Sequence, residues 1–170
     1  MITEKEAVQL LESMASDKNV KHCRGVAEAA FELATKIKKK NSQLNIDPLK
    51  IKIAALLHDI GKCREGVHEL NTIEILKREG LDDIADIAMH GFLYEICLLE
   101  GKNTHGLLPK NLENKIVVLA DMYYNQKEER VSLEQRFEDM ESRYGDLFLK
   151  AIRLAKPRMI KLEEEISNLI

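Results

Sequence analysis

The sequence predicts an all-α protein that folds as a single compact domain of about eight helices. The chain has only 3 prolines and 8 glycines among its 170 residues, too few for the regular turns of an all-β sandwich. Hydrophobic residues make up 45% of the chain, which excludes global disorder. Apolar residues recur at helical spacing in successive segments, and no alternating pattern typical of strands is present.

Two helices are predicted within the first 40 residues. The first begins with a capping box, in which Thr3 caps the helix and Glu6 reaches back from three residues later. The second covers about residues 19–39 and ends in three lysines, whose charge suits the negative end of the helix dipole. The apolar residues at helical spacing are Ala7, Val8, Leu11 and Met14 in the first helix, and Val20, Val26, Ala30, Leu33 and Ile37 in the second.

The third helix is predicted to lie at the centre of the domain. Asp47 and Pro48 mark its start, because aspartate caps helices well and proline fits their first turn. Residues 51–57 are apolar nearly all round, and a helix of this kind is usually buried. The helix leads into His58 and Asp59, and we expect Gly61 to end it as a C-terminal cap.

The next two helices are expected at about residues 68–79 and 83–99. Gly80 ends the first of them, and Gly91 indicates a break within the second. Residues 101–110 are expected to form a loop, because glycine and proline recur there.

Three more helices are predicted in the C-terminal third of the chain. Asn111 caps the first of them. Ser132 and Gln135 form a second candidate capping box for the next. The last helix starts at Asp146, and we expect Pro157 to kink or break it.

Charge and cysteine content limit the partners and the compartment. The 26 basic and 29 acidic residues give a net charge of −3, which argues against a protein that binds nucleic acid by bulk charge. The 3 cysteines show no Cys-x-x-Cys spacing, so we expect reduced thiols and a cytoplasmic location. The N-terminus lacks signal-peptide features, and apolar runs of about five residues fall far short of the roughly 20 that span a bilayer, so no membrane partner is expected.

Two carboxylates follow apolar helical segments, where an unpaired charge would be costly to bury. Asp59, beside His58, ends the most apolar helix of the chain, and Asp121 ends the apolar run 116–120. Each therefore needs a cation, a metal or strong hydrogen-bond donors nearby. The alternative is that Asp59 caps a neighbouring helix and that Asp121 has a capping or ion-pair role.

Three further histidines are candidates for the same site. His22 shares the apolar face of its helix with Val26 and Leu33, so it points inward, as a core histidine would also do. His68 and His90 could be surface residues or could hold a second ion. The imidazoles of His22 and His58, combined with the two carboxylates, would suit a metal of intermediate softness.

Taken in order, His22, His58-Asp59 and Asp121 resemble the HD superfamily of metal-dependent phosphohydrolases. The segment 54–62, Ala-Ala-Leu-Leu-His-Asp-Ile-Gly-Lys, is similar to the superfamily's signature in its HDIG form. The segment from His68 to His90 and the run that ends at Asp121 also resemble family segments. The resemblance covers about residues 20–125 and leaves residues 131–170 as a C-terminal helical extension of one domain, 1–170.

The resemblance implies an HD-domain-like, all-α fold with His22, His58, Asp59 and Asp121 as ligands of one divalent metal. His68 and His90 match the positions that hold a second metal in some members, with Asp59 bridging. The ligand types suit Fe, Mn, Co, Ni or Zn, and they do not exclude Mg as the bound metal. His90 is followed by Gly-Phe-Leu-Tyr, which differs from the Thr-Thr-Gly of members that cleave diadenosine tetraphosphate.

The implied function is hydrolysis of a phosphomonoester or phosphodiester, expected on a small phosphorylated substrate such as a nucleotide, by a metal-bound hydroxide. In this hypothesis Asp59 orients the nucleophile as well as binding metal. Lys62, just past the helix end, is expected to act in catalysis and substrate binding by neutralising charge on the phosphate. Arg64 is the second candidate for contacting substrate.

Two other interpretations stay open at this stage. The domain could be a non-catalytic metal- or nucleotide-binding regulatory module, although its complete ligand set argues against this. Residues 131–170 could instead pair with a partner or a second copy to form a homodimer, which is compatible with catalysis. The seam for that pairing consists of Ile160, Leu162, Ile166 and Leu169.

Overall fold

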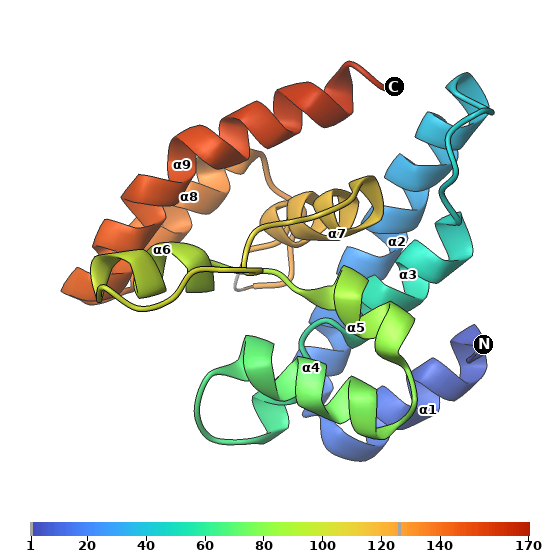
Figure 1. Cartoon of the computed structure of the whole chain (residues 1–170), viewed down its shortest axis with the longest axis horizontal. Coiled ribbons are helices and arrows are strands. Elements are labelled where there is room, and N and C mark those ends of the chain that lie inside the picture. Colours follow the sequence, from blue (N-terminus) through green and yellow to red (C-terminus); the bar gives the residue numbers. More distant parts are fainter. Residues whose placement is uncertain (1, 126) are drawn as a thin grey trace.

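The computed structural model describes residues 2–125 and 127–170 and confirms the all-α fold (Figure 1). Within this part of the chain the only β interaction is an isolated bridge between Tyr124 and Arg130. The helices are α1 (Glu4–Met14), α2 (Asp17–Lys40), α3 (Pro48–Leu57), the 3₁₀ helix η1 (Ile60–Cys63), α4 (His68–Arg78), α5 (Asp82–Ala88), α6 (Leu93–Leu99), α7 (Leu112–Met122), α8 (Leu133–Glu141) and α9 (Asp146–Ser167).

The helix starts follow the capping signals of the sequence. Thr3 and Ser132 each form the complete capping box, and the side chain of Asp47 accepts hydrogen bonds from the backbone N–H groups at the start of α3. Asn111 caps α7 in the same way. Helix α2 begins slightly earlier than its apolar pattern indicates, because the hydroxyl of Ser16 accepts the N–H of Asn19 and fixes the first turn there.

Helix α3 lies at the centre of the molecule, as its apolar character predicts. It packs against α2, α7, α5 and α1, and its residues Ile51, Ile53, Ala54, Ala55 and Leu57 are fully buried. Because α3 is surrounded, the residues that follow it are also held inside the protein. This placement carries His58 and Asp59 into the interior, both essentially without exposure to solvent.

Gly61 has a different role from the predicted one. Helix α3 already ends at Leu57, and Gly61 lies inside η1 rather than acting as a C-terminal cap. A Cβ atom on Gly61 would lie 2.2 Å from the carbonyl oxygen of His68 and 2.4 Å from the backbone nitrogen of Thr72. The glycine is therefore needed because α4 approaches the backbone of this turn so closely.

The segment 83–99 forms two helices, with the break near Gly91 that the sequence indicates. Gly91 has a φ of +78°, a left-handed conformation that glycine adopts without strain, and it separates α5 from α6. The break leaves His90 in the short link between these helices rather than within one of them. It also raises the number of α-helices among the described residues from the expected eight to nine.

Helix α9 runs without interruption through Pro157, so the expected break does not occur. Proline removes one backbone hydrogen bond, the one to the carbonyl oxygen of Arg153. Both Pro157 and Arg153 are exposed, so water can reach that carbonyl oxygen. The opposite face of α9 is buried against the rest of the protein through Ala155, Met159 and other apolar residues, and this packing holds the helix together.

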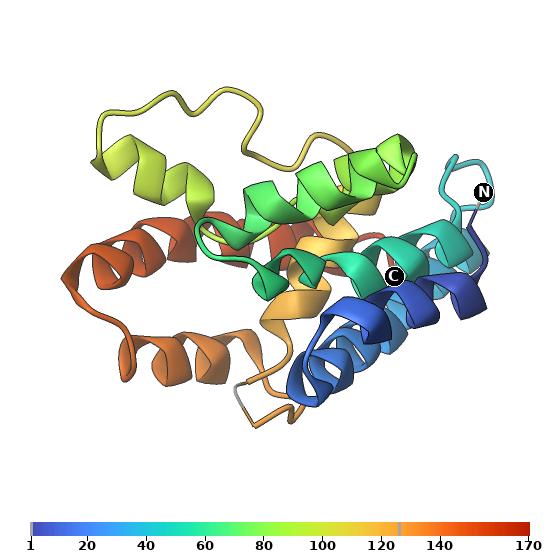
Figure 2. The same cartoon turned by 90° about the horizontal axis from the view of Figure 1, so that it is seen from below.

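The C-terminal extension packs onto the body of the protein. Figure 2 shows α8 and the start of α9 on one side, α1 to α3 on the other, and α7 between them, with the end of α9 running past α7. Helix α9 contacts α6 and α7. A bidentate ion pair joins Arg158 to the buried carboxylate of Glu95, with Nε 2.8 Å from Oε1 and Nη2 3.1 Å from Oε2. Leu162 and Ile166 are buried in this packing, so half of the proposed homodimer seam is already covered by the chain itself.

Among the helices of the described residues, none combines the length and the apolar character needed to cross a membrane.

Candidate metal centre

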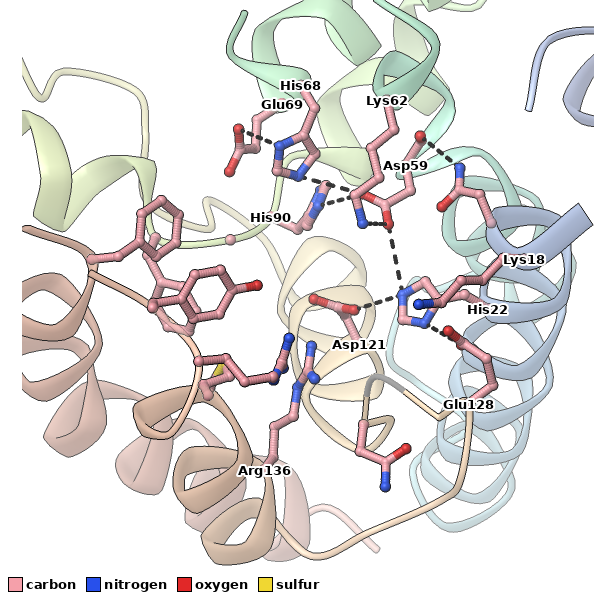
Figure 3. Close-up of a pocket in the computed structure, with 18 of the residues that line it drawn as sticks. Lys18, His22, Asp59, Lys62, His68, Glu69, His90, Asp121, Glu128 and Arg136 are labelled. Atoms are coloured by element: carbon pink, nitrogen blue, oxygen red, sulfur yellow. Dashed lines mark hydrogen bonds and ion pairs between the residues drawn. The ribbon is translucent and has the colours of Figure 1, made fainter. Parts of the chain in front are cut away.

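Six side chains from separate parts of the chain converge beside the end of α3. Figure 3 labels all of them except His58. We call these six residues the candidate metal centre, or metal centre for short: His22 from α2, His58 and Asp59 after α3, His68 from the first turn of α4, His90 from the link between α5 and α6, and Asp121 from the end of α7. The structure thus brings together every histidine and aspartate that the sequence singled out as a ligand.

Four of these residues face a common point. Nε2 of His22 lies 3.0 Å from Oδ1 of Asp121 and 3.7 Å from Oδ2 of Asp59. Nε2 of His58 lies 3.6 Å from each of the same two oxygen atoms. Two imidazole nitrogens and two carboxylate oxygens at this mutual spacing could hold one divalent ion.

The other oxygen of Asp59 faces a second pair of histidines. Its Oδ1 atom lies 3.2 Å from Nε2 of His90 and 3.4 Å from Nε2 of His68. One carboxylate, 1% exposed, therefore presents one oxygen to His22 and His58 and the other to His68 and His90. This is the arrangement of a carboxylate that bridges two ions.

All four histidines present Nε2 to the centre because Nδ1 is engaged elsewhere. Nδ1 of His58 donates to the carbonyl oxygen of Ala55 at 2.6 Å, and that of His90 donates to Ala88 at 3.0 Å. A carbonyl oxygen only accepts hydrogen bonds, so Nδ1 carries a proton, and in the neutral imidazole the lone pair therefore lies on Nε2. Partners of this kind orient metal-binding histidines.

Two glutamates that the sequence analysis did not single out complete this arrangement. Oε2 of Glu128 lies 2.9 Å from Nδ1 of His22, and Oε2 of Glu69 lies 3.2 Å from Nδ1 of His68. Glu69 is buried, and a Cβ atom on Gly91 would lie 2.6 Å from its Oε1, so the glycine also makes room for this carboxylate. Glu128 is 106 positions away from His22, and no local pattern connects them.

The centre keeps its carboxylates ionised and at least one imidazole neutral. Burial alone would raise the pKa of Asp59, but His58 and His90 beside it hold that pKa well below its usual range. Burial and the neighbouring His90 lower the pKa of His68 to about 3. His68 is therefore neutral near pH 7, with a lone pair available to a ligand.

Two buried atoms show that the residues fit a metal. Nε2 of His58 and Oδ1 of Asp59 have no hydrogen-bond partner among the described residues, although both are inaccessible to solvent. Leaving such a polar atom unsatisfied costs about 1–3 kcal/mol. A divalent cation that accepts nitrogen and carboxylate ligands would satisfy both atoms.

The two candidate substrate-binding residues have different surroundings. Lys62 lines the cavity at the metal centre, and its ammonium forms a short ion pair with Oδ2 of Asp59. Arg64 lies outside the cavity lining, and its Nη1 atom is 3.5 Å from Oε1 of Glu74 on α4. The structure therefore brings Lys62 to the site and directs Arg64 elsewhere.

A cavity of about 370 Å³ opens over the metal centre. One side is formed by the metal centre, with Lys18 and Lys62 near it. The other side consists of residues that lie beyond the sequence resemblance; we call them the α8–α9 wall: Arg136, Met140, Arg143, Tyr144 and Phe148. The volume is in the range that small-molecule sites occupy.

Comparison with known proteins agrees with the geometry of the site. The model of the HD domain family matches residues 19–126, which include all six residues of the metal centre. An uncharacterized protein of Methanocaldococcus jannaschii is 34% identical over 173 residues, which cover 97% of each chain. No solved structure matches this chain. With its family segment and its histidine and aspartate set in place, the chain belongs to the HD domain family, whose members are mostly metal-dependent hydrolases.

Proposed function

We propose that this protein is a metal-dependent phosphohydrolase that cleaves a phosphomonoester or phosphodiester bond of a small substrate, a nucleotide in particular. The observation that carries the proposal is the placement of Asp59. Its two oxygens face two separate histidine pairs, His22 with His58 and His68 with His90, under a cavity that admits a small molecule.

In this proposal His22, His58, Asp59 and Asp121 hold one divalent ion, and His68, His90 and Asp59 hold a second. Iron, manganese, cobalt, nickel and zinc are the leading candidates, because histidine and carboxylate ligands suit them, and magnesium is a further candidate through its affinity for carboxylates. When bound, such an ion activates water at neutral pH and polarises the phosphoryl oxygen.

The residues of the chain supply the remaining functions. Asp59 is buried beneath the cavity and orients the attacking water toward the phosphorus atom. Lys62 is half exposed, so its ammonium can turn from Asp59 to a phosphoryl oxygen and stabilise the charge that develops there. Glu128 and Glu69 hold His22 and His68 in the tautomers that the site requires.

The nucleotide part of the proposal is supported by the far end of the cavity. Tyr144 and Phe148 line it and stack on each other with ring centroids 4.8 Å apart. An aromatic surface of this kind suits the flat face of a base.

All three cysteines, Cys23, Cys63 and Cys97, are free, which supports the expected cytoplasmic location.

The test combines metal analysis of the purified protein with a screen of phosphoesters and nucleotides in added Mn²⁺, Co²⁺, Ni²⁺ or Mg²⁺. We expect bound metal, and turnover that Asp59→Ala abolishes while the far-ultraviolet circular dichroism spectrum is unchanged. Asp86→Ala, at an exposed aspartate on α5, is the matched control and should retain full turnover. Unchanged turnover in Asp59→Ala would overturn the assignment, and metal binding without turnover of any substrate would favour a regulatory module.

A further inference from the structure

We propose that the α8–α9 wall is the specificity element of the cavity, and that Arg136 and Arg143 bind a second anionic group of the substrate. This inference rests on the proposed function, because it takes the first phosphoryl group to lie at the metal centre. Both arginines follow residue 126, where the match to the HD domain family ends. They are therefore features of this chain beyond the family's own segment.

The two arginines face the same cavity as the metal centre. Arg136 projects from α8 toward the side of the cavity where Asp121 lies (Figure 3). Its side chain is 13% exposed and that of Arg143 is 22% exposed, so neither extends into bulk solvent. Partly buried guanidinium groups at the edge of a cavity are placed to meet a ligand rather than water.

Both guanidinium groups share one carboxylate. Nη2 of Arg143 lies 2.6 Å from Oδ2 of Asp139, and Nη1 of Arg136 lies 3.3 Å from the same oxygen. Two positive charges against one negative charge leave the wall with a surplus of one positive charge. Among the described residues, Asp139 is the carboxylate that forms ion pairs with these arginines.

The arginines also have unused hydrogen-bond donors. Nε of Arg136 is buried and has no partner among the described residues. A guanidinium group carries five N–H donors in a planar fork, and this fork matches the oxygens of a phosphate or a carboxylate. The charge surplus and the free donors together indicate an anionic ligand at the wall.

Arg143 is already held in position for such a ligand. Its Nε donates to the backbone carbonyl oxygen of Asp139 at 3.0 Å, and its guanidinium carbon lies 5.1 Å from the ring centroid of Tyr144. Stacking on an aromatic ring and pairing with Asp139 restrict the rotamers of the side chain. Little further ordering is needed when an anion binds, and this favours affinity.

The wall is fixed relative to the metal centre. Helix α9 is anchored to α6 by the ion pair between Arg158 and Glu95, and to the residue after α7 by the hydroxyl of Tyr123, which donates to Glu163 at 3.0 Å. Helix α8, which carries Arg136, packs against α9, and its Phe137 and Met140 are buried in the core. The separation between the two anion-binding ends is therefore set by the fold. The geometry selects a small substrate with two anionic groups, a scissile phosphoryl group and a second phosphate or carboxylate.

The experiment uses linear α,ω-bisphosphonates with spacers of about two to six carbons and the matching alkyl monophosphonates. Their C–P bonds resist hydrolysis, so binding to the Mn²⁺-loaded protein can be measured by titration calorimetry without turnover. For the spacer that matches the fold, we expect the bisphosphonate to bind about tenfold or more tightly than its monophosphonate, as one charge-assisted interaction would provide. An α-carboxylate, ω-phosphonate series distinguishes a second phosphate from a carboxylate.

The double variant Arg136→Met/Arg143→Met should bring the ratio of the two affinities close to one. Arg153→Met, at an exposed arginine of α9 that lies outside this cavity, is the matched control and should keep the wild-type ratio. Equal affinity of the wild type for the two probes at every spacer length would overturn the inference, as would a ratio that survives in the double variant.

These outcomes are distinct from failure of the proposed function. Metal-dependent monophosphonate binding without a bisphosphonate advantage contradicts only the role of the wall. A wild-type protein that binds neither probe and turns over no phosphoester contradicts both proposals. Thermal unfolding of the double variant checks that it is folded. The single variants Arg136→Lys and Arg143→Lys keep the positive charge but lose the planar guanidinium donors, so they should give intermediate ratios of bisphosphonate to monophosphonate affinity.

Discussion

Nδ1 of His22 lies 2.9 Å from Oε2 of Glu128, so the loop after α7 holds a histidine of α2 in the orientation that the metal centre uses. Glu128 itself has a φ of +63°, an uncommon conformation for a residue other than glycine. The backbone of the loop thus adopts a strained conformation at the point where this carboxylate meets the imidazole.

Glu128→Gln is expected to weaken metal binding by about 10–100-fold, because an amide orients the imidazole of His22 less well than a carboxylate does. Competition with a chromophoric chelator would measure the dissociation constant for Mn²⁺ directly. Glu138→Gln, at an exposed glutamate of α8, should leave that constant unchanged. Equal affinities of Glu128→Gln and the wild type would show that this carboxylate does not support the site.

Gly61→Ala is expected to lower the free energy of unfolding by roughly 3 kcal/mol or more, because the new Cβ atom would overlap the backbone of α4. The closest atoms are backbone atoms of His68 and Thr72, which cannot move aside as the end of a flexible side chain can. Urea denaturation measures the change.

Gly145→Ala provides the control for that substitution. A Cβ atom there meets no other atom within 4 Å, and its φ of −73° suits alanine. We expect at most a small loss, of about 1 kcal/mol, because Gly145 is the N-cap of α9 and alanine caps helices less well than glycine. A similar loss of stability in both variants would contradict the role given to Gly61.

The capping box of α1 is expected to stabilise the protein in a pH-dependent way. The backbone N–H and the hydroxyl of Thr3 donate to the carboxylate of Glu6, at 2.8 and 2.7 Å, and they lower its pKa. A pKa that is lower in the folded state contributes stability above the unfolded-state value of 4.5, and this contribution is lost as pH falls through the folded-state pKa.

Glu6→Gln removes the charge and keeps the length of the side chain. Its urea midpoint should therefore be lower than that of the wild type at pH 7, and the difference should shrink toward zero as the pH falls below 4.5 and through the folded-state pKa of Glu6. A difference that stayed constant across this range would assign the effect to side-chain packing and not to the carboxylate charge.

The sequence predicted most of the helices because their signals are local. Thr3, Asp47 and Ser132 each bind backbone groups within a few residues, so their roles can be recognised from neighbouring positions alone. Asp59 was recognisable for another reason: a carboxylate at the end of a largely apolar helix is expected to be buried and must then have a compensating partner.

The features that the sequence did not predict depend on contacts between distant segments. Gly61 resembled a helix cap, and its actual role is set by the approach of α4, which only the packed structure reveals. Glu128 and the α8–α9 wall follow α7 in the sequence, and they reach the site because the chain folds back over it after that helix. Their partners lie far away in the sequence, and no periodicity links Arg136 or Arg143 to Asp59.

If two ions bind as proposed, the shared carboxylate of Asp59 would make the two halves of the metal centre thermodynamically dependent on each other. An ion bound beside His22 and His58 would be coordinated by the Asp59 carboxylate, and this same carboxylate faces His68 and His90. Linkage then requires that each ion change the affinity for the other by the same factor. Occupancy of the second position would thus respond to the concentration of free metal differently from an isolated site, and the cavity would contain one ion or two according to the metal supply of the cell.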